Sequence, residues 1–275
     1  MLAVQILTAL LIGIIQGITE WLPISSTGHM LLFNELFPLS VSKEFLELFT
    51  VVIQLGSILA VVVRFFDRLN PFSRDKYQQR QALSLWWKVA LASIPVAIFG
   101  FLFDDKLSEL LYGKGNAASI VIAISLIVYG AAFILIERLR KTPTVSGGVT
   151  AKKAFLIGCF ETLAIIPGTS RSGSTVLGAM LLGESRTVAA EFSFFLAIPA
   201  MLGAGALKTL KFILSGISMS VEEGIILAVG CISAFLVSIA VIEFLTEFVK
   251  KHSFVPFGIY RILLGTTVIV WMVLK

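Results

Sequence analysis

Two polar stretches interrupt otherwise apolar sequence and carry side chains suited to phosphate chemistry. Residues 16–29 and 161–175 each combine a carboxylate, a proline, hydroxyl groups and glycines, and the second also contains Arg171. An arginine at membrane depth costs about 2.5–3.5 kcal/mol on insertion scales, so such a residue points to a function. Irregular backbone is tolerated at that depth only against protein or a water-filled cavity. We therefore expect both stretches to line a cavity.

The second stretch has the composition of an anion site. Ser170 and Ser172 precede an apolar run and are expected to cap a short helix, whose N-terminal N–H groups favour phosphate. Arg171 adds a planar fork of donors that matches phosphate oxygens. A buried salt bridge from Arg171 to Glu20 or Glu161 is the alternative interpretation. The predicted phosphate-binding residues are Ser25, Thr27, Gly168, Ser170, Arg171, Ser172, Gly173 and Thr175.

The first stretch supplies a nucleophile, a base and cation ligands. Gln16 and Glu20 are four residues apart and share one helix face. A carboxylate beside a phosphate needs a bridging cation, so we expect Mg²⁺ or Ca²⁺ on Glu20 and Gln16, with Glu161 as a further ligand. Ser26 offers a hydroxyl and His29 a general acid or base, and the nucleophile stays open between Ser26, His29 and a water. The predicted catalytic residues are Glu20, Ser26, His29 and Arg171.

The composition indicates an integral membrane protein. The 275 residues are 57% hydrophobic and 14% charged, whereas soluble domains have about 45–50% apolar and about 25% charged residues. The formal charge of +5 lies mostly in loops and indicates membrane topology, so no nucleic-acid partner is expected.

The apolar sequence divides into spans and broken regions. The predicted spans are 45–66, 84–103, 117–137, 187–209, 224–248 and 255–274. Residues 2–37 and 152–184 are each broken near the middle, which predicts two re-entrant helical hairpins.

Loop charge tests this arrangement. The loops 64–88, 138–153 and 249–253 are basic, whereas 104–116 is mixed. Six spans and two hairpins that return to their own side place all three basic loops on one face. The positive-inside rule makes that face cytoplasmic and puts both termini outside. The catalytic cavity is then expected to open outward, because the ends of the first hairpin lie outside.

The chain is expected to be one membrane domain, residues 1–275, made of two similar halves. Residues 1–140 and 150–275 each contain a hairpin followed by three spans. Three spans per half force opposite orientations, which is an inverted repeat. Such folds place their site near the midplane, where the broken helices meet. The predicted fold class is therefore all-α, with six transmembrane helices and two re-entrant hairpins.

Both polar stretches resemble signatures of one family. Gln16-Gly-Ile-Thr-Glu20 followed by Leu-Pro-Ile-Ser-Ser-Thr-Gly-His29 resembles the first signature of the bacterial undecaprenyl-diphosphatase family, also known as bacitracin-resistance proteins. Pro167-Gly-Thr-Ser-Arg171-Ser-Gly-Ser-Thr175 resembles the second. Position 16 is Gln where many members carry Glu. The resemblance extends over Val52–Ala60, Glu191–Pro199 and Phe254–Arg261.

The resemblance implies an activity and a location. The expected reaction removes the terminal phosphate of undecaprenyl diphosphate, which regenerates the cell-wall lipid carrier and lowers the amount of bacitracin's target. The expected partners are a prenyl diphosphate lipid and the lipids of the bacterial inner (plasma) membrane. The active site is expected to face the periplasm or cell exterior. A second copy of the chain, in a homodimer, is left open as a partner.

Two other function classes remain. Inverted repeats with broken helices are typical of transporters, so a transporter or flippase for an anionic or phospholipid-like substrate is the alternative. The nucleophile and base of the first hairpin favour an enzyme instead. A lipid phosphatase with a phosphohistidine intermediate needs a second histidine near Arg171, but the chain has only His29 and His252.

Overall fold

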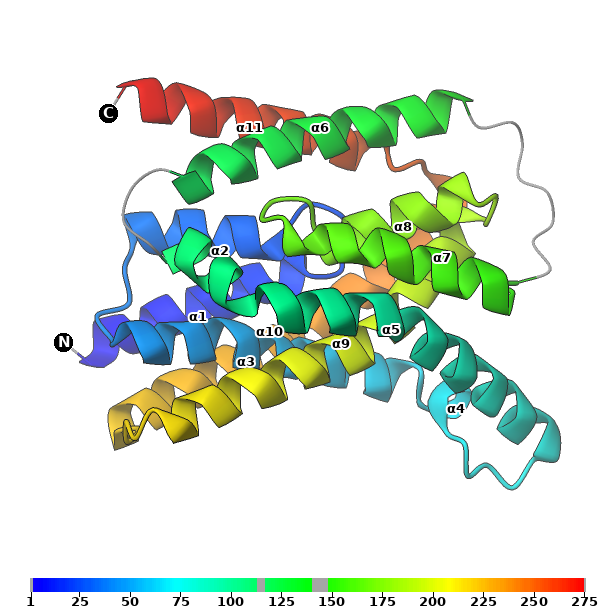
Figure 1. The fold of residues 1–275 in the computed structure, drawn as a ribbon, viewed down its shortest axis with the longest axis horizontal. Coiled ribbons are helices and arrows are strands. Elements are labelled where there is room, and N and C mark those ends of the chain that lie inside the picture. Colours follow the sequence, from blue (N-terminus) through cyan, green and yellow to red (C-terminus); the bar gives the residue numbers. More distant parts are fainter. Residues whose placement is uncertain (1, 113–116, 140–147, 275) are drawn as a thin grey trace.

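The computed structural model describes residues 2–112, 117–139 and 148–274, and its regular structure in these ranges is entirely helical. Long helices run roughly along one axis, with two pairs of short helices among them (Figure 1). The all-α prediction is confirmed. The elements are α1 (Leu2–Thr19), α2 (Ser26–Leu36), α3 (Lys43–Arg64), α4 (Phe66–Leu69), α5 (Lys76–Tyr112), α6 (Ala117–Leu139), α7 (Ala151–Glu161), the 3₁₀ turn η1 (Thr162–Ile165), α8 (Arg171–Leu181), α9 (Arg186–Leu214), α10 (Val221–Lys251) and α11 (Val255–Leu274).

Six long helices occupy the predicted spans, namely α3, α5, α6, α9, α10 and α11. With α1, seven helices of the described residues are long and apolar enough to cross a membrane. The chain is therefore a multi-pass membrane protein. By length and composition α1 could cross a membrane like the other six helices. The division into six spans and two hairpins therefore stays a prediction.

Both predicted ends of the span 84–103 were wrong. Part of the predicted loop 64–88 is helical, because α5 begins at Lys76. Residues 104–116 were expected to form a loop, but α5 continues to Tyr112, and residues 113–116 lie outside the described residues. The sequence between Phe103 and Tyr112 contains neither glycine nor proline, so nothing there stops a helix before Gly113. Charge alone does not end a helix that extends beyond the apolar layer.

Two short helix pairs approach each other from opposite ends of the molecule. In Figure 1, α1 and α2 reach the middle from the left, and α7 and α8 reach it from the right. Residues 20–25 join the first pair, and η1 with residues 166–170 joins the second. Both broken regions predicted from the sequence therefore contain two helices with a turn between them.

The two turns end in the same way. Ser25 and Ser170 are the N-cap residues of α2 and α8, and each side chain accepts a hydrogen bond from the N–H three residues later, of Gly28 or Gly173. Their φ angles are 77° and 73°, and no other non-glycine residue in the described ranges has a positive φ. Such backbone costs about 1–3 kcal/mol per residue and persists only where surrounding contacts enforce it. This likeness supports the proposed organisation in two halves.

The arrangement of the ends matches the loop-charge argument. In Figure 1 the α3–α5 junction, the end of α6, the start of α7 and the α10–α11 junction all lie at the right, and both termini lie at the left. Residues 140–147 of the predicted basic loop 138–153 lie outside the described residues. Which end is cytoplasmic stays a prediction.

Close backbone contact joins α11 to α6. A Cβ atom built on Gly130 would lie 2.6 Å from the carbonyl oxygen of Gly258, and one on Gly258 would lie 2.8 Å from that of Gly130. Small residues let membrane helices approach this closely where no hydrophobic force between helices is available. The contact brings the side chains that follow Gly258 down onto the backbone of α6.

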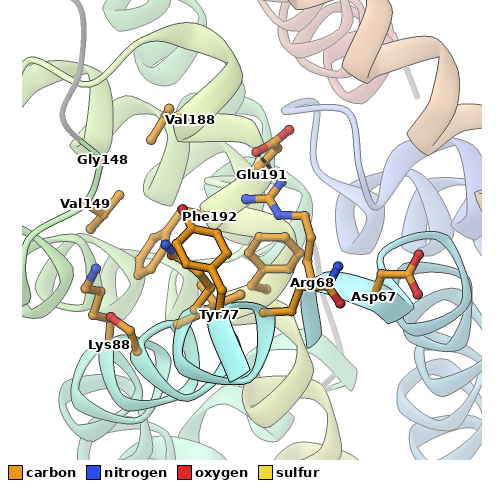
Figure 2. A pocket seen from close by; sticks show the side chains of 14 residues that line it. Asp67, Arg68, Tyr77, Lys88, Gly148, Val149, Val188, Glu191 and Phe192 are labelled. Carbon is orange, nitrogen blue, oxygen red and sulfur yellow. Dashed lines mark hydrogen bonds and ion pairs between the residues drawn. The ribbon is translucent and has the colours of Figure 1, made fainter. Parts of the chain in front are cut away.

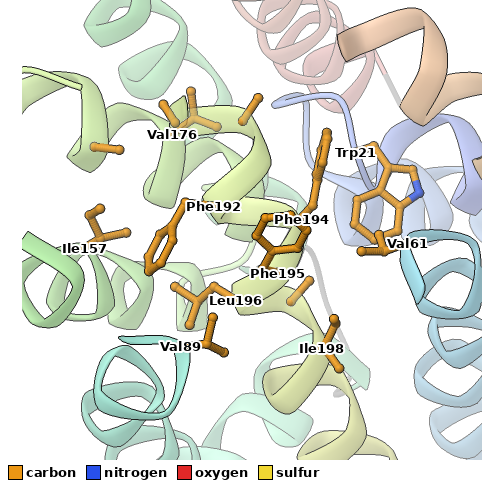
Figure 3. Close-up of a cluster of buried hydrophobic side chains, with 14 of the residues drawn as sticks. Trp21, Val61, Val89, Ile157, Val176, Phe192, Phe194, Phe195, Leu196 and Ile198 are labelled. Carbon is orange, nitrogen blue, oxygen red and sulfur yellow. The ribbon is translucent and has the colours of Figure 1, made fainter. Parts of the chain in front are cut away.

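An aromatic cluster packs under the first turn. Trp21, Phe194 and Phe195 are at most 1% exposed (Figure 3). The two phenylalanines belong to α9, and Trp21 belongs to the first turn. The rings of Trp21 and Phe194 meet edge to face, with centroids 5.4 Å apart. Such pairs contribute about 0.5–1.5 kcal/mol beyond the area they bury. The cluster fixes Trp21, the residue that follows Glu20.

Candidate active site

The two polar stretches are in direct contact. Nη2 of Arg171 donates to Oε1 of Glu20 at 3.0 Å, although 151 residues separate them. The Ser172 hydroxyl lies 3.1 Å from the carbonyl oxygen of Glu20 and 3.2 Å from that of Leu22. The ion pair that was the alternative for Arg171 is therefore present. The ion pair also belongs to the candidate site, because Glu20 and Arg171 line the same cavity as the predicted nucleophile Ser26.

One carboxylate connects the reactive groups. The hydroxyl of Ser26 donates to Oε2 of Glu20 at 2.7 Å, and Nε2 of Gln16 donates to the same oxygen at 3.0 Å. Glu20 is only 5% exposed. A buried carboxylate that accepts a hydrogen bond from a serine hydroxyl at this distance has the geometry of a general base.

A cavity of about 260 Å³ lies between the two turns. The helices α2 and α8 both begin at its wall, and their first N–H groups carry the positive end of the helix dipole. Two helix N-termini and a guanidinium therefore surround one space, which suits a diphosphate. The residues of the polar stretches that line it are Glu20, Ser25, Ser26, Thr27, Glu161, Ala164, Ile165, Pro167, Gly168, Ser170 and Arg171.

Arg171 contacts the first turn and α9 and has one buried donor without an acceptor. Its Nη1 donates to the carbonyl oxygen of Ser193 at 2.9 Å and its Nη2 to Glu20, but its buried Nε–H has no acceptor. The guanidinium lies over Trp21, 5.9 Å from the ring centroid. The contacts with Trp21, Ser193 and Glu20 hold the plane of the guanidinium in one orientation.

The structure does not bring His29 to the hydroxyl of Ser26. Its Nδ1 lies 2.7 Å from the carbonyl oxygen of Ser25, and its Nε2 lies 2.7 Å from the hydroxyl of Tyr260. His29 is not among the residues that line the cavity. The hydrogen bond expected from a base to Ser26 is made by Glu20 instead.

Three predicted phosphate-binding residues lie behind the cavity wall. Ser172, Gly173 and Thr175 do not line it. The Thr175 hydroxyl is 3.0 Å from the Arg171 carbonyl oxygen and 2.6 Å from the Ser193 hydroxyl, and the N–H of Gly173 is taken by Ser170. These residues belong to the first turns of α8, and their hydrogen bonds hold the backbone that carries Arg171 in place.

Buried acceptor oxygens remain for a cation. Both carboxylate oxygens of Glu161 and Oε1 of Gln16 are buried without a hydrogen-bond partner, and both residues are 0% exposed. An unpaired buried carboxylate is costly unless a cation or a proton compensates it. No group of three or more His, Cys, Asp or Glu side chains in the described part of the chain could hold a metal ion by itself. Magnesium usually binds one or two carboxylates together with substrate phosphates, and Glu20 and Glu161 fit that mode.

The sequence interpretation missed part of the cavity wall. Thr50 and Gln54 of α3 line it opposite the turns. Their spacing of four within an apolar helix was an available signal, because it places both on one face. Arg261 of α11 was also missed as a site residue, although it reaches both turns.

A larger cavity elsewhere lacks this chemistry. It measures about 560 Å³ and lies between α4, α5 and α9, and Figure 2 shows Arg68 pointing at Glu191 within it. That ion pair is 2.7 Å long. Lys88 and Asp67 complete a balanced set of charges, and none of the residues of the two polar stretches contributes to the lining. We therefore place the site in the smaller cavity.

Comparison with known proteins identifies the family of the chain. Residues 9–267 match the family model described as bacitracin resistance protein BacA. The chain belongs to this family. The BacA match includes both turns and the part of α11 from Val255 to Thr267. The chain is 52% identical over 274 residues to undecaprenyl-diphosphatase 1 of Clostridioides difficile strain 630, covering 98% of this chain and 97% of that protein.

Further relatives of this BacA-family chain carry the same name. It is 50% identical over 281 residues to the undecaprenyl-diphosphatase of Streptococcus equi subsp. equi strain 4047, covering 100% and 99% of the two chains. It is also 50% identical over 275 residues to that of Enterococcus faecalis strain V583, covering 98% of each. The site described above therefore lies in a chain that aligns with these proteins end to end.

Proposed function

We propose that this chain is a membrane phosphatase that hydrolyses undecaprenyl diphosphate to undecaprenyl phosphate and phosphate, and so recycles the cell-wall lipid carrier. The observation that carries the proposal is the set of contacts around Glu20, which joins the Ser26 hydroxyl to Arg171 at the meeting point of two helix N-termini. The relatives named undecaprenyl-diphosphatase support the same substrate.

The first chemical step follows from the Ser26 hydrogen bond. The oxygen of Ser26 attacks the terminal phosphorus while its proton passes to Oε2 of Glu20, 2.7 Å away. The bond from that phosphorus to the bridging oxygen breaks, and the lipid leaves as its monophosphate. Arg171 and the first N–H groups of α2 and α8 stabilise the charge on the phosphoryl oxygens.

The second step releases phosphate. A water attacks the phosphoserine and loses a proton to a carboxylate, and the bond from phosphorus to the Ser26 oxygen breaks. The proton held by Glu20 returns to that oxygen. Glu20 therefore acts as base and then as acid. The proton taken from water leaves the other carboxylate with the released phosphate, so the enzyme returns to its starting state.

A divalent cation fits the same cavity. Glu20 and Glu161, which both line the cavity, would hold it, and it would neutralise charge on the diphosphate. Gln16 does not line the cavity and supports this site through its bond to Glu20. Both carboxylates face a space that also suits an anion, which otherwise repels them.

One other function, transport, and one other phosphatase mechanism are less favoured. A transporter has no use for a serine hydrogen-bonded to a buried carboxylate beside the anion site. A phosphohistidine mechanism needs two histidines at the phosphate, but His252 ends α10 against the ring of Phe248, and neither His29 nor His252 lines the cavity.

The proposed location follows the loop charges. The cavity opens toward the cell exterior in the inner (plasma) membrane of a bacterium, and the prenyl tail stays in the lipid. The diphosphate group leaves water to enter the cavity, and its chain passes between helices.

Trapping the phosphoserine tests the proposal. Purified protein is mixed with undecaprenyl diphosphate, quenched in acid, digested and searched by mass spectrometry for phosphate on Ser26, while phosphate release is followed in parallel. Ser26→Ala should lose both signals. Ser93→Ala is the matched control, because among the described residues the Ser93 hydroxyl bonds only the Val89 carbonyl oxygen of its own helix. Phosphate release at the wild-type rate by Ser26→Ala would refute the nucleophile.

A further inference from the structure

Arg261 is a buried cation with an unusual set of partners. The residue lies on α11, is 0% exposed, and its guanidinium bonds only backbone carbonyl oxygens in the described part of the chain. The ring of Tyr129 lies 5.3 Å from the guanidinium carbon. A buried charge without a counter-charge is costly, so a residue of this kind is retained for what it holds in place.

The carbonyl groups bound by Arg261 belong to both turns of the proposed active site. Nη1 donates to Pro23 at 2.8 Å, in the first turn. Nη2 donates to Gly168 at 2.8 Å and to Thr169 at 3.0 Å, in the second turn. Thr169 directly precedes Ser170, and Pro23 lies two residues before Ser25. One planar guanidinium therefore bridges the two turns, in addition to the contacts that Arg171 and Ser172 make with the first turn.

Tyr260, the preceding residue, acts on the first turn by another route. Its hydroxyl lies 2.7 Å from Nε2 of His29, and Nδ1 of His29 lies 2.7 Å from the carbonyl oxygen of Ser25. A carbonyl oxygen only accepts, so Nδ1 carries the hydrogen, and in the neutral imidazole Nε2 then accepts from Tyr260. The chain of bonds ends on Ser25, whose left-handed backbone directly precedes Ser26.

We propose that Tyr260 and Arg261 are positioning residues that align Ser26 and Glu20 with Arg171. Neither lines the cavity, so neither touches substrate in the proposed reaction. Arg261 holds the two turns at a fixed distance, and Tyr260 holds the backbone of Ser25 through His29. His29 then contributes to the reaction through the position of Ser26, without transferring a proton. This inference rests on the proposed function for its kinetic part only.

Arg261→Lys is the sharpest variant. A lysine keeps the charge but is a point donor, so it does not bridge Pro23 and Gly168 as the planar fork does. We expect kcat to fall by about 100-fold while KM changes by less than about threefold, because a displacement near 1 Å costs this much in rate. Tyr260→Phe keeps the ring and removes one hydrogen bond, so kcat should fall by about tenfold.

A distance measurement separates positioning from general stability. Ile18 lies just before the first turn and Ile166 in the second, and both are exposed, at 38% and 46%. Spin labels at Ile18→Cys and Ile166→Cys, in a background with Cys159→Ala and Cys231→Ala, report the separation of the turns by pulsed electron paramagnetic resonance. Arg261→Lys should broaden the distance distribution in protein that remains folded and monodisperse.

The control is Arg68→Lys, which makes the same replacement in an ion pair outside both turns and should leave the distribution narrow. An unchanged distribution in Arg261→Lys overturns the proposal, whether kcat stays normal or falls together with thermal stability. If Arg261→Lys does not fold, Tyr260→Phe decides the inference on the same two measurements. The distance measurement needs no substrate, so its outcome is independent of whether the proposed phosphatase activity is correct.

Discussion

Glu20 and Arg171 form an ion pair of 3.0 Å that joins the first turn to the second. The same carboxylate accepts the Ser26 hydroxyl, so a change at either partner alters the environment of the nucleophile. The two sequence motifs therefore act as one unit, and the effects of their mutations are expected to be non-additive.

The first prediction concerns the shape of the Arg171 guanidinium. Arg171→Lys and Arg171→Ala should both lower kcat/KM for undecaprenyl diphosphate by at least about 100-fold, since the loss of one preorganised donor costs about that much. A lysine keeps the charge but not the fork that holds Ser193, Glu20 and a phosphate together. Phosphate release at saturating and limiting substrate measures both parameters.

Arg68→Lys is the matched control for this measurement. Arg68 also pairs with a carboxylate at 2.7 Å, but its partner Glu191 lies in the larger cavity. Its activity should stay within about twofold of the wild type, because exposed ion pairs contribute little. Turnover close to wild type in Arg171→Lys would contradict the bidentate role.

Glu161 should control the response to divalent cations. Its carboxylate is buried, unpaired and at the cavity wall. Glu161→Gln removes the charge but keeps the size, so binding of Mn²⁺, measured by electron paramagnetic resonance on protein without substrate, should weaken by at least about tenfold. Glu191→Gln, a carboxylate of the larger cavity, should bind Mn²⁺ as the wild type does. Equal Mn²⁺ affinity in all three proteins would remove Glu161 from the cation site.

Gly168 should not tolerate a side chain. Its φ is +91°, and a Cβ atom there would lie 2.6 Å from the carbonyl oxygen of Ile122. Gly168→Ala should lower stability by at least about 2 kcal/mol, or the thermal midpoint by about 5 °C, and displace the carbonyl that Arg261 holds.

Gly203→Ala provides the comparison, because a Cβ atom at Gly203 meets nothing within 4 Å and the residue lies within α9. That variant should keep its thermal midpoint or raise it slightly, since alanine favours helix by about 1 kcal/mol over glycine. Intrinsic fluorescence during heating in detergent measures both. Equal midpoints for the two variants would show that the second turn adapts to a side chain.

Outward opening of the cavity is testable on intact cells. Ser26→Cys in a background with Cys159→Ala and Cys231→Ala should react with a membrane-impermeant thiol reagent added to spheroplasts. Added undecaprenyl diphosphate should slow the reaction, because it occupies the same cavity. Labelling that begins only after permeabilisation would reverse the predicted orientation.

Helix content and the meeting of the two turns could be anticipated from the sequence for separate physical reasons. Long apolar runs fix the membrane helices, and Ser25 and Ser170 precede glycines at capping distance. The end of α5 could not be placed in the same way, because charged residues with good helix propensity continue a helix into water. Helix boundaries beyond the apolar layer depend on local stop signals, which hydropathy does not report.

The roles within the site were harder to predict, because they depend on where each side chain points. His29 and Ser26 are three residues apart on α2, yet Nδ1 of His29 contacts the carbonyl oxygen of Ser25 and leaves the Ser26 hydroxyl to Glu20. Thr175 likewise turns toward Ser193, away from the cavity. A motif lists suitable groups, but a single χ angle decides which of them faces the substrate and which supports the backbone.

The close contact of Gly130 with Gly258 has a consequence for how the protein is made. The ribosome completes α11 after every other helix of the described chain, so both turns are synthesised before Arg261 exists. Until α11 docks on α6 through these glycines, nothing bridges the carbonyl groups of Pro23 and Gly168. The nascent chain therefore inserts into the membrane without the Arg261 bridge between its two turns, and this bridge forms in the last step of its assembly.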